Sequence, residues 1–128
     1  MAKSNVRFGK EERLRKRKEF LEVYEKGEKL AGRVFFCYFL RRDLSFSRLG
    51  VTVSRKIGNT VVRNRTKRRL REVFRLHKHQ LVPPCDMVIN ARRSASFASY
   101  QLLEEEFLKA TTWWNEKWDG GWPGRSAS

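Results

Sequence analysis

The chain has 128 residues and carries 29 Lys and Arg against 14 Asp and Glu, a formal net charge of +15 at pH 7. A chain of this length forms one domain around one core, which excludes an enzyme built from two domains. Because 40% of the residues are hydrophobic, the chain is expected to fold, and its charge favours polyanions, nucleic acids above all, over acidic small molecules.

The composition indicates one domain between two flexible ends. Residues 1–10 are polar and basic and contain a glycine, so they are expected to form a flexible basic arm. Residues 119–128 combine turn residues without periodicity and are expected to form a flexible tail. The single domain is therefore placed at residues 11–118.

The first predicted element is a short amphipathic helix at residues 18–26. Phe20, Val23 and Tyr24 recur at helical spacing on one face, and Gly27 follows as the candidate C′ residue. A helix this short is expected to pack against a sheet.

Two strands are predicted next, at residues 33–41 and 49–54. The first segment is rich in aromatic and β-branched residues, and the second alternates apolar with small residues. A turn at residues 43–47 is expected to join them into a hairpin. Residues 29–32 either extend the first strand or form an edge strand of their own.

Residues 59–78 have helical periodicity, and Asn59 is the candidate N-cap. On a wheel of about 100° per residue, the packing side holds Val62, Leu70, Val73, Phe74 and His77. The adjacent arc holds Asn64, Lys67, Arg68, Arg71, Arg75 and Lys78, with Arg65 and Arg69 beyond it. One side of the helix therefore packs and the other presents a cationic surface.

The positive charge is concentrated around this helix. Residues 1–93 carry 26 basic and 9 acidic side chains, whereas residues 94–128 carry 3 and 5. Between Asp43 and Glu72 there is no acidic residue. Nine basic residues lie there: Arg48, Arg55, Lys56, Arg63, Arg65, Lys67, Arg68, Arg69 and Arg71. Such a block repels itself unless an anion faces it.

The rest of the chain contributes one strand and one helix. Pro83 and Pro84 end the long helix, and residues 85–91 form a third long strand candidate. A loop of small residues at 94–99 leads into a helix at 100–114.

No targeting segment, membrane span or metal-binding cysteine pair is predicted. Cys37 and Cys85 lie in separate apolar stretches, so they are expected to be buried, reduced thiols. The amino-terminal residues lack the apolar core of a signal peptide, and the longest apolar run, Val34 to Leu40, is far shorter than the roughly 20 residues that cross a bilayer. We expect a cytoplasmic protein without a membrane partner.

Catalytic templates are absent from the sequence. Neither a G-x-x-x-x-G-K-[ST] loop nor a G-x-G-x-x-G turn is present. His77 and His79 point to different sides of a helix end without zinc-motif spacing, and no Asp or Glu pair indicates a two-metal nuclease. We therefore predict no catalytic residue, no metal-binding residue and no small-molecule substrate.

The most informative segment is residues 54–71. Gly58 and Asn59 place a tight turn and a helix N-terminus, which favour anion binding, beside Arg55 and Lys56. Arg predominates over Lys, which suits bidentate phosphate contacts. A solvated basic helix face would explain scattered lysines but not an acid-free block dominated by Arg.

Within this segment, K-I-G-N-T-V-V-R-N-R-T-K-R-R-L-R resembles the signature of the protein component of bacterial ribonuclease P. Supporting similarity covers residues 11–110 and includes R-L-R-K-R-K-E-F, R-L-G-V-T-V-S and D-M-V-I-N-A-R-R-S-A. Thr60 departs from the Ala that is usual after Gly-Asn. The resemblance implies that residues 11–118 form a single RNA-binding domain.

The resemblance also implies the fold and the function. The fold is an α+β, αβββαβα two-layer sandwich around a four-stranded mixed sheet, with an unusual left-handed βαβ crossover, and it resembles the second domain of a small-subunit ribosomal protein. The function is to assist endonucleolytic removal of the 5′ leader from precursor tRNA. The catalyst is the RNA subunit with its magnesium ions, so the protein binds no cofactor and its partners are that catalytic RNA and precursor tRNA.

Two sets of site residues carry over from the family. The residues expected to bind the catalytic RNA are Arg55, Lys56, Asn59, Arg63, Asn64, Arg65, Lys67, Arg68 and Arg71. The residues expected to bind the tRNA leader are Phe20, Tyr24, Tyr38 and Arg93, in and beside an aromatic cleft. Stacking on exposed rings would give sequence-tolerant binding of a single strand. Phe20 and Tyr24 at helical spacing are core residues in most proteins, and that interpretation stays open here.

Two other functions are compatible with a small basic chain. A ribosomal or other structural RNA-binding protein would contact ribosomal RNA and would leave tRNA ends unaffected. A nuclease acting alone would cleave RNA without an RNA partner, but it would need the paired carboxylates that the sequence lacks.

Overall fold

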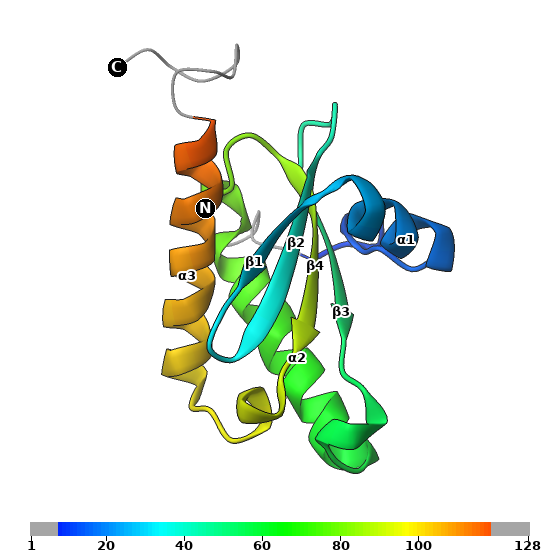
Figure 1. Ribbon diagram of the computed structural model, residues 1–128, viewed down its shortest axis with the longest axis vertical. Helices are drawn as coiled ribbons and strands as arrows, with labels where there is room; N and C mark the ends of the chain where they lie inside the picture. The colour runs from blue at the N-terminus through cyan, green and yellow to red at the C-terminus, as the bar shows by residue number, and fades with distance from the viewer. Residues whose placement is uncertain (1–7, 119–128) are drawn as a thin grey trace.

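The structure is a computed structural model that describes residues 8–118, and it contains one four-stranded sheet, three α-helices and four short 3-10 helices (Figure 1). The strands are β1 (Glu28–Ala31), β2 (Phe35–Arg41), β3 (Arg48–Thr52) and β4 (Cys85–Ala91). The α-helices are α1 (Arg17–Lys26), α2 (Thr60–His77) and α3 (Tyr100–Lys117). The 3-10 helices are η2 (Lys10–Glu12), η3 (Arg55–Ile57), η4 (Lys78–Gln80) and η5 (Arg93–Ser96).

The predicted flexible tail and most of the predicted basic arm lie outside the described residues. Of the arm, residues 8–10 are described. Phe8 packs edge-on against Phe74 of α2, with ring centroids 5.5 Å apart. The chain therefore already contacts the core before η2 begins.

The sheet has the order β1-β2-β4-β3 and is mixed. β2 is antiparallel to both β1 and β4, whereas β3 is parallel to β4. The predicted hairpin between residues 33–41 and 49–54 is therefore wrong, because β4 lies between the two strands. β4 occupies this central place because its first five residues are buried on both faces. Residues 28–31 form the edge strand, and β1 is the true hairpin partner of β2.

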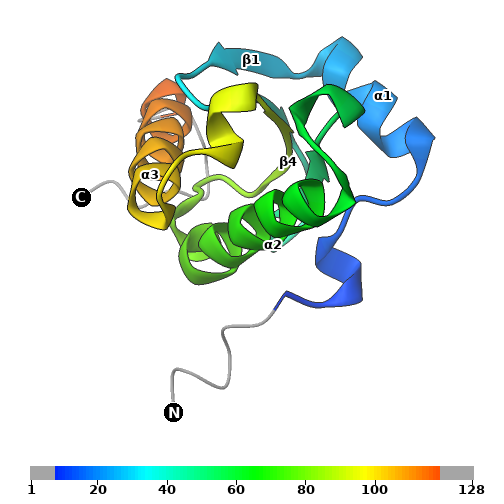
Figure 2. The same ribbon diagram turned by 90° about the horizontal axis from the view of Figure 1, so that it is seen from below.

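The connection from β3 through α2 to β4 is a left-handed crossover, as expected. In Figure 1, β3 and β4 run in the same direction with β3 to the right of β4, and Figure 2 shows that α2 lies on the face of the sheet that is turned away from the viewer in Figure 1. α2 and α3 cover one face of the sheet, whereas α1 covers part of the opposite face (Figure 2). The αβββαβα order and the α+β class are thus as predicted.

Side chains alternate along β2 between two apolar clusters on the two faces of the sheet. Phe35, Cys37 and Phe39 belong to the large cluster beneath α2 and α3, and Tyr38 packs in a small cluster with Val23 of α1. Cys37 and Cys85 are both buried and free, and burial raises the pKa of each thiol. Both cysteines therefore remain protonated core residues, as predicted.

The sequence predicts the residue that caps the start of α2, but it does not predict the conformation of the residue that follows α1. Asn59 caps α2 as predicted, since its Oδ1 accepts a hydrogen bond from the Val62 amide at 3.0 Å. Gly27 directly follows α1, as predicted, but it is the C-cap in an extended conformation with φ −86° and not the predicted C′ residue. A Cβ at Gly27 would lie 2.5 Å from the Val23 carbonyl oxygen and 2.6 Å from that of Phe39. Glycine is needed there because two backbone segments approach closely.

Candidate nucleic-acid interface

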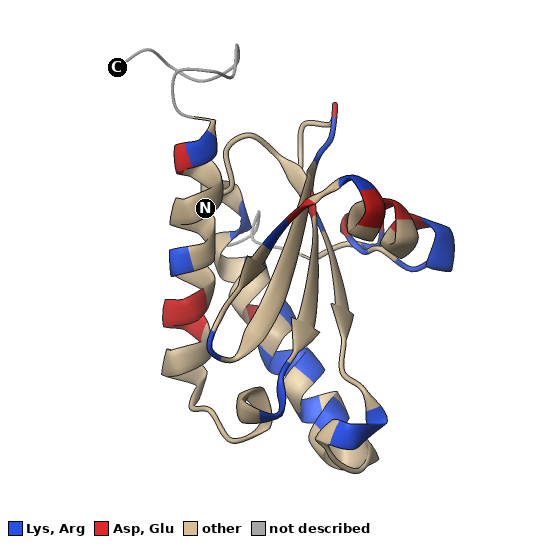
Figure 3. Ribbon diagram, in the orientation of Figure 1, with Lys and Arg blue, Asp and Glu red and all other residues tan. Residues whose placement is uncertain are grey.

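The residues predicted to bind the catalytic RNA lie together on η3, on α2 and at the N-cap of α2. We call this set, Arg55, Lys56, Asn59, Arg63, Asn64, Arg65, Lys67, Arg68 and Arg71, the basic surface. Figure 3 shows the basic residues gathered along the lower part of α2 and the turn that precedes it. α2 presents them because Thr66, Leu70, Val73 and Phe74 on its other side are buried against the sheet and α3.

The positive charges of the basic surface are not neutralised within the described part of the chain. None of its Lys or Arg side chains forms an ion pair among residues 8–118. Arg63 instead donates hydrogen bonds to the Gly58 carbonyl at 2.9 Å and to the Thr60 hydroxyl at 3.3 Å. These neutral acceptors orient the guanidinium and leave its charge uncompensated.

Arg71 shows how closely these cations are placed. Burial lowers the pKa of Arg71, and the nearby charge of Arg13 lowers it further. The two arginines line a surface depression of about 360 Å³ together with Phe8, Arg68 and the Glu72–Arg75 ion pair, so Arg13, Arg68 and Arg71 are its cations without an ion-pair partner among residues 8–118. An anion in this depression would relieve their repulsion, which makes Arg13 a candidate site residue that the sequence alone did not indicate.

Arg48 belongs to the acid-free block in sequence but not to the basic surface in space. Its guanidinium donates to both carboxylate oxygens of Asp86, at 2.8 and 2.6 Å, and Arg42 donates to Asp86 at 2.8 Å. The Asp86 side chain is fully buried, and its hydrogen bonds raise the pKa of both arginines. Glu19 and Glu22 of α1 complete the network. These arginines therefore hold α1 to the sheet and are not free to bind RNA.

A second candidate surface lies on the opposite face, where the structure brings Phe20, Tyr24 and Tyr38 together. Tyr24 and Tyr38 are in edge-to-face contact with centroids 4.8 Å apart. The Tyr24 hydroxyl donates to Asn90 Oδ1 at 2.9 Å. Phe20 lies over Gly50, where a Cβ would approach its Cζ to 2.5 Å. All three rings are half-buried, so they pack on the small cluster and also keep part of their surface exposed.

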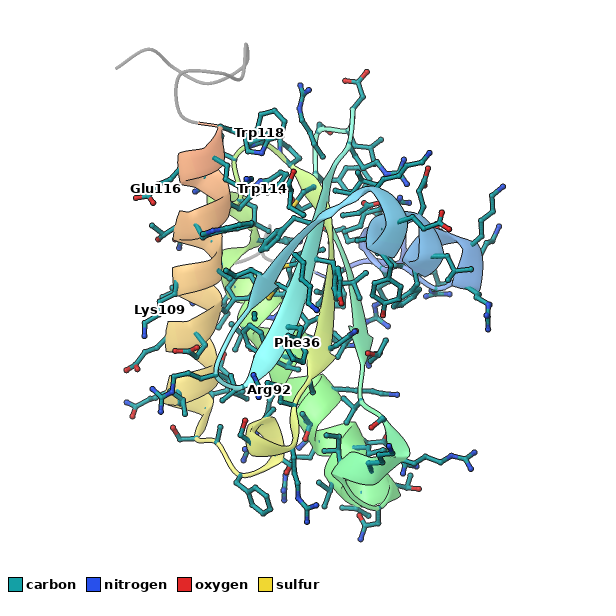
Figure 4. The ribbon with its side chains drawn as sticks, in the orientation of Figure 1. Phe36, Arg92, Lys109, Trp114, Glu116 and Trp118 are labelled. Carbon is teal, nitrogen blue, oxygen red and sulfur yellow. The ribbon has the colours of Figure 1, made fainter. Side chains whose placement is uncertain are left out.

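This surface includes a fourth ring and two cations that sequence reasoning missed. Phe36 points to the same face as Tyr38, and the Arg92 guanidinium carbon lies 4.9 Å from its ring centroid (Figure 4). The Lys29 ammonium lies 5.0 Å from the Phe36 ring and 5.7 Å from the Tyr38 ring. The spacing of Phe36 and Tyr38 by two residues in a strand was the available signal. We call Phe20, Tyr24, Phe36 and Tyr38 the aromatic surface.

Arg93, predicted to lie beside the rings, is the first residue of η5 and is exposed. It is the neighbouring Arg92 whose side chain reaches the aromatic surface, and Arg92 also donates to the Gly32 carbonyl at 2.9 Å. Of the two adjacent arginines, Arg92 therefore makes the defined contact with a ring.

The described residues form no metal centre and no membrane span. Within residues 8–118, no group of three or more His, Cys, Asp or Glu side chains could hold a metal ion. His77 Nε2 lies 2.7 Å from Glu104 Oε2 and so links α2 to α3. In the same range, no helix is both long and apolar enough to cross a bilayer.

A basic surface on one side, exposed rings on the other and an α+β core between them define a nucleic-acid-binding protein. Residues 8–114 match the family model described as Ribonuclease P. The chain is 44% identical over 96 residues to the ribonuclease P protein component of Desulfatibacillum aliphaticivorans, which covers 75% of this chain and 81% of that one. This chain therefore belongs to the ribonuclease P protein family, whose members are protein subunits of ribonuclease P.

Solved structures agree with this assignment. The Staphylococcus aureus RNase P protein matches with a TM-score of 0.72 and 32% identity, over 81% of this chain and 98% of that one. The Thermotoga maritima RNase P protein matches with a TM-score of 0.71 and 33% identity, over 78% and 94% of the two chains. The fold class and the family expected from the signature motif are both confirmed.

Proposed function

We propose that this chain is the accessory subunit of a ribonuclease P whose active site lies in its RNA subunit. The basic surface binds that RNA, and the aromatic surface binds the 5′ leader of precursor tRNA, which assists endonucleolytic removal of the leader in the cytoplasm. Magnesium ions serve the RNA subunit. The observation that carries this proposal is the set of arginines on η3 and α2 that form no ion pair within the described residues.

Binding to the RNA subunit follows from charge and geometry. Each Lys or Arg of the basic surface that binds a phosphate releases a counterion condensed on the RNA. The protein therefore gains affinity for RNA without contacting its bases. Arg63 is already oriented by its hydrogen bonds to Gly58 and Thr60, which lowers the entropy lost on binding. The rigid helix spaces the cations along a line that suits a folded RNA backbone.

Binding to the leader follows from the aromatic surface. Rings offer stacking faces to any base, so a single strand can be bound without sequence preference. Asn90 Oδ1 accepts from both the Tyr24 and the Thr52 hydroxyls, at 2.9 and 2.6 Å, which fixes Tyr24 before any ligand arrives. The cations Lys29 and Arg92 lie where they can meet the phosphates between stacked bases.

The experiment is cleavage of precursor tRNA by the cognate RNA subunit at low magnesium, with and without the protein. We expect the protein to increase the rate of correct 5′ cleavage, because its cations replace part of the charge screening that magnesium supplies. The Arg63→Ala, Arg65→Ala, Arg68→Ala triple variant should fold normally and fail to increase the rate. An equal rate with and without the wild-type protein would contradict the proposal, and cleavage by the protein alone would favour an autonomous nuclease.

A further inference from the structure

Phe97 is unusually exposed for an aromatic residue. Its exposed fraction is 79%, the largest of any large hydrophobic side chain among residues 8–118. It follows η5 directly and precedes α3, while its neighbours Ala95, Ser96 and Ala98 are buried. The backbone of this loop is thus packed into the fold and only the ring projects from it.

Two arginines of α2 hold the loop on either side of the ring. Arg65 Nη2 donates to the Ser96 carbonyl at 3.5 Å, and Arg69 Nη1 donates to the Ala98 carbonyl at 3.3 Å. Arg65 and Arg69 lie one helical turn apart on α2, so their two contacts flank Phe97. The ring is therefore presented on a backbone that is fixed before any partner binds.

The residues around the Phe97 ring include a member of the basic surface and extend that surface toward α3. Arg65 belongs to that surface, and Arg69 extends it toward α3. Both guanidinium groups bond here to neutral carbonyl oxygens, so they retain their positive charge. Val61, one turn before Arg65, is 72% exposed and adds a second apolar side chain at the same end of α2.

We propose that Phe97 stacks on an unpaired base of the ribonuclease P RNA while Arg65 and Arg69 bind the flanking phosphates. This inference rests on the proposed binding of that RNA by the basic surface and names one base contact within it. A protein partner fits less well, because stable protein interfaces need about 1,000 Å² of complementary surface, and here a single ring projects between two cations. A base linked by phosphates matches both the ring and the charges.

The test measures the affinity of the full chain for its cognate RNA subunit over a range of salt concentrations. Phe97→Ala should weaken binding about 5- to 150-fold, the range for loss of one stacked base, without changing the slope of log K against log salt. Arg68→Ala should instead reduce that slope by about one. Stacking releases no counterion, and this difference separates the contribution of the ring from that of a cation of the basic surface.

Two further variants test whether the ring acts by stacking. Phe97→Trp should restore the affinity, whereas Phe97→Leu, which keeps an apolar side chain without a planar face, should bind as weakly as Phe97→Ala. The control is Leu44→Ala, because Leu44 is 40% exposed in the β2–β3 loop at the far end of the sheet (Figure 1). We expect the Leu44 variant to bind like the wild type, and the thermal stability of all these variants to be unchanged.

Three results would overturn the inference. Phe97→Ala could bind with wild-type affinity, Phe97→Leu could bind as well as the wild type, or the free protein could form dimers in sedimentation that Phe97→Ala abolishes. In the third case the partner of the ring is a second copy of the chain. If the wild type binds the RNA and promotes leader removal in any of these cases, the proposed function stands and only the stacking contact fails.

Discussion

At the scale of single residues, the arginines of this protein divide into two groups by what surrounds them. Arg42 and Arg48 meet the buried carboxylate of Asp86, so their charges are used within the fold. Arg63 and Arg65 meet only neutral oxygens and keep their charge for a ligand. The residue type is the same in both groups, and the partner decides whether an arginine stabilises the fold or keeps its charge available for the proposed binding of RNA.

Arg48→Ala should therefore destabilise the fold, while Arg68→Ala should not. Removing Arg48 leaves the buried Asp86 carboxylate with only Arg42, and we expect a loss of about 3 kcal/mol, the lower end of the range for a broken buried ion pair. The exposed Arg68 lacks an internal ion-pair partner among the described residues, so its loss should cost less than about 0.5 kcal/mol. Urea unfolding of the two variants measures the difference. Equal stabilities would contradict the division into two groups.

Glu19 makes stability depend on pH. The pKa of Glu19 is lowered, first by the Arg15 amide that donates to it at 3.0 Å, and also by the Lys16 amide and the charge of Arg48. Because the pKa is lower in the folded state, this stability is present above the ordinary value of 4.5 and is lost as the pH falls through the folded pKa. Glu19→Gln should lose less stability than the wild type between about pH 5 and about pH 3, as measured by urea unfolding. An identical loss in both proteins would exclude this role of Glu19.

At the scale of elements, β2 serves two purposes because its side chains alternate. Phe35, Cys37 and Phe39 are part of the main core, and Phe36 and Tyr38 belong to the aromatic surface on the opposite face of the sheet. One strand thus anchors the fold on one face and offers rings on the other.

Tyr38→Leu should weaken binding of precursor tRNA to the assembled RNA and protein while leaving mature tRNA unaffected. The variant keeps an apolar side chain beside Tyr24 but loses a stacking face, so we expect a loss of about 1 to 3 kcal/mol for the leader. Mature tRNA, which has no leader, is the matched control. A parallel loss of affinity for both tRNAs would show that the ring supports the fold and does not contact the leader.

The elements also show what the sequence could predict. α2, its Asn59 cap and β4 follow from local periodicity and side-chain chemistry, and their positions were predicted within two residues. The pairing of strands could not be predicted in the same way, because β4 enters the sheet from 33 residues beyond β3 in the chain. The left-handed crossover was expected only through the family resemblance, since general rules favour the opposite hand.

In the candidate site, too, local sequence patterns predict some features, whereas contacts between distant segments could not be predicted. The basic surface lies within one continuous segment, residues 55–71, which the sequence pattern and the family resemblance both indicated, and a helical wheel predicted the exposed side for its members on α2 such as Lys67 and Arg68. Arg48 lies in the same acid-free block of the sequence, but its partner Asp86 lies 38 residues further along the chain, so no local pattern shows that the charge of Arg48 is used within the fold. The contact of Arg92 with Phe36 joins the residue that follows β4 to β2, and no local pattern in the sequence predicts such a pair.

At the scale of the whole molecule, the charge is unevenly distributed. α3 carries Lys109 and Lys117, which pair with Glu106 at 3.2 Å and with Glu28 at 3.5 Å, whereas the cations of the basic surface form no ion pair within residues 8–118. Affinity for the RNA subunit should therefore fall steeply with salt concentration. Lys109→Ala should leave the slope of log K against log salt unchanged, while Lys67→Ala should reduce it by about one. Equal effects of the two substitutions would show that charge acts nonspecifically.

The placement of α1 and α2 on opposite faces of the sheet has a geometric consequence (Figure 2). If the RNA subunit binds on the α2 side and the leader on the α1 side, as proposed, the two RNAs contact different side chains and neither should displace the other. Under the proposed function, we therefore expect the protein to keep the RNA subunit and the leader apart by the thickness of the sheet and its helices. A leader too short to reach the α1 side of the sheet should gain no affinity from the protein, whatever its base sequence.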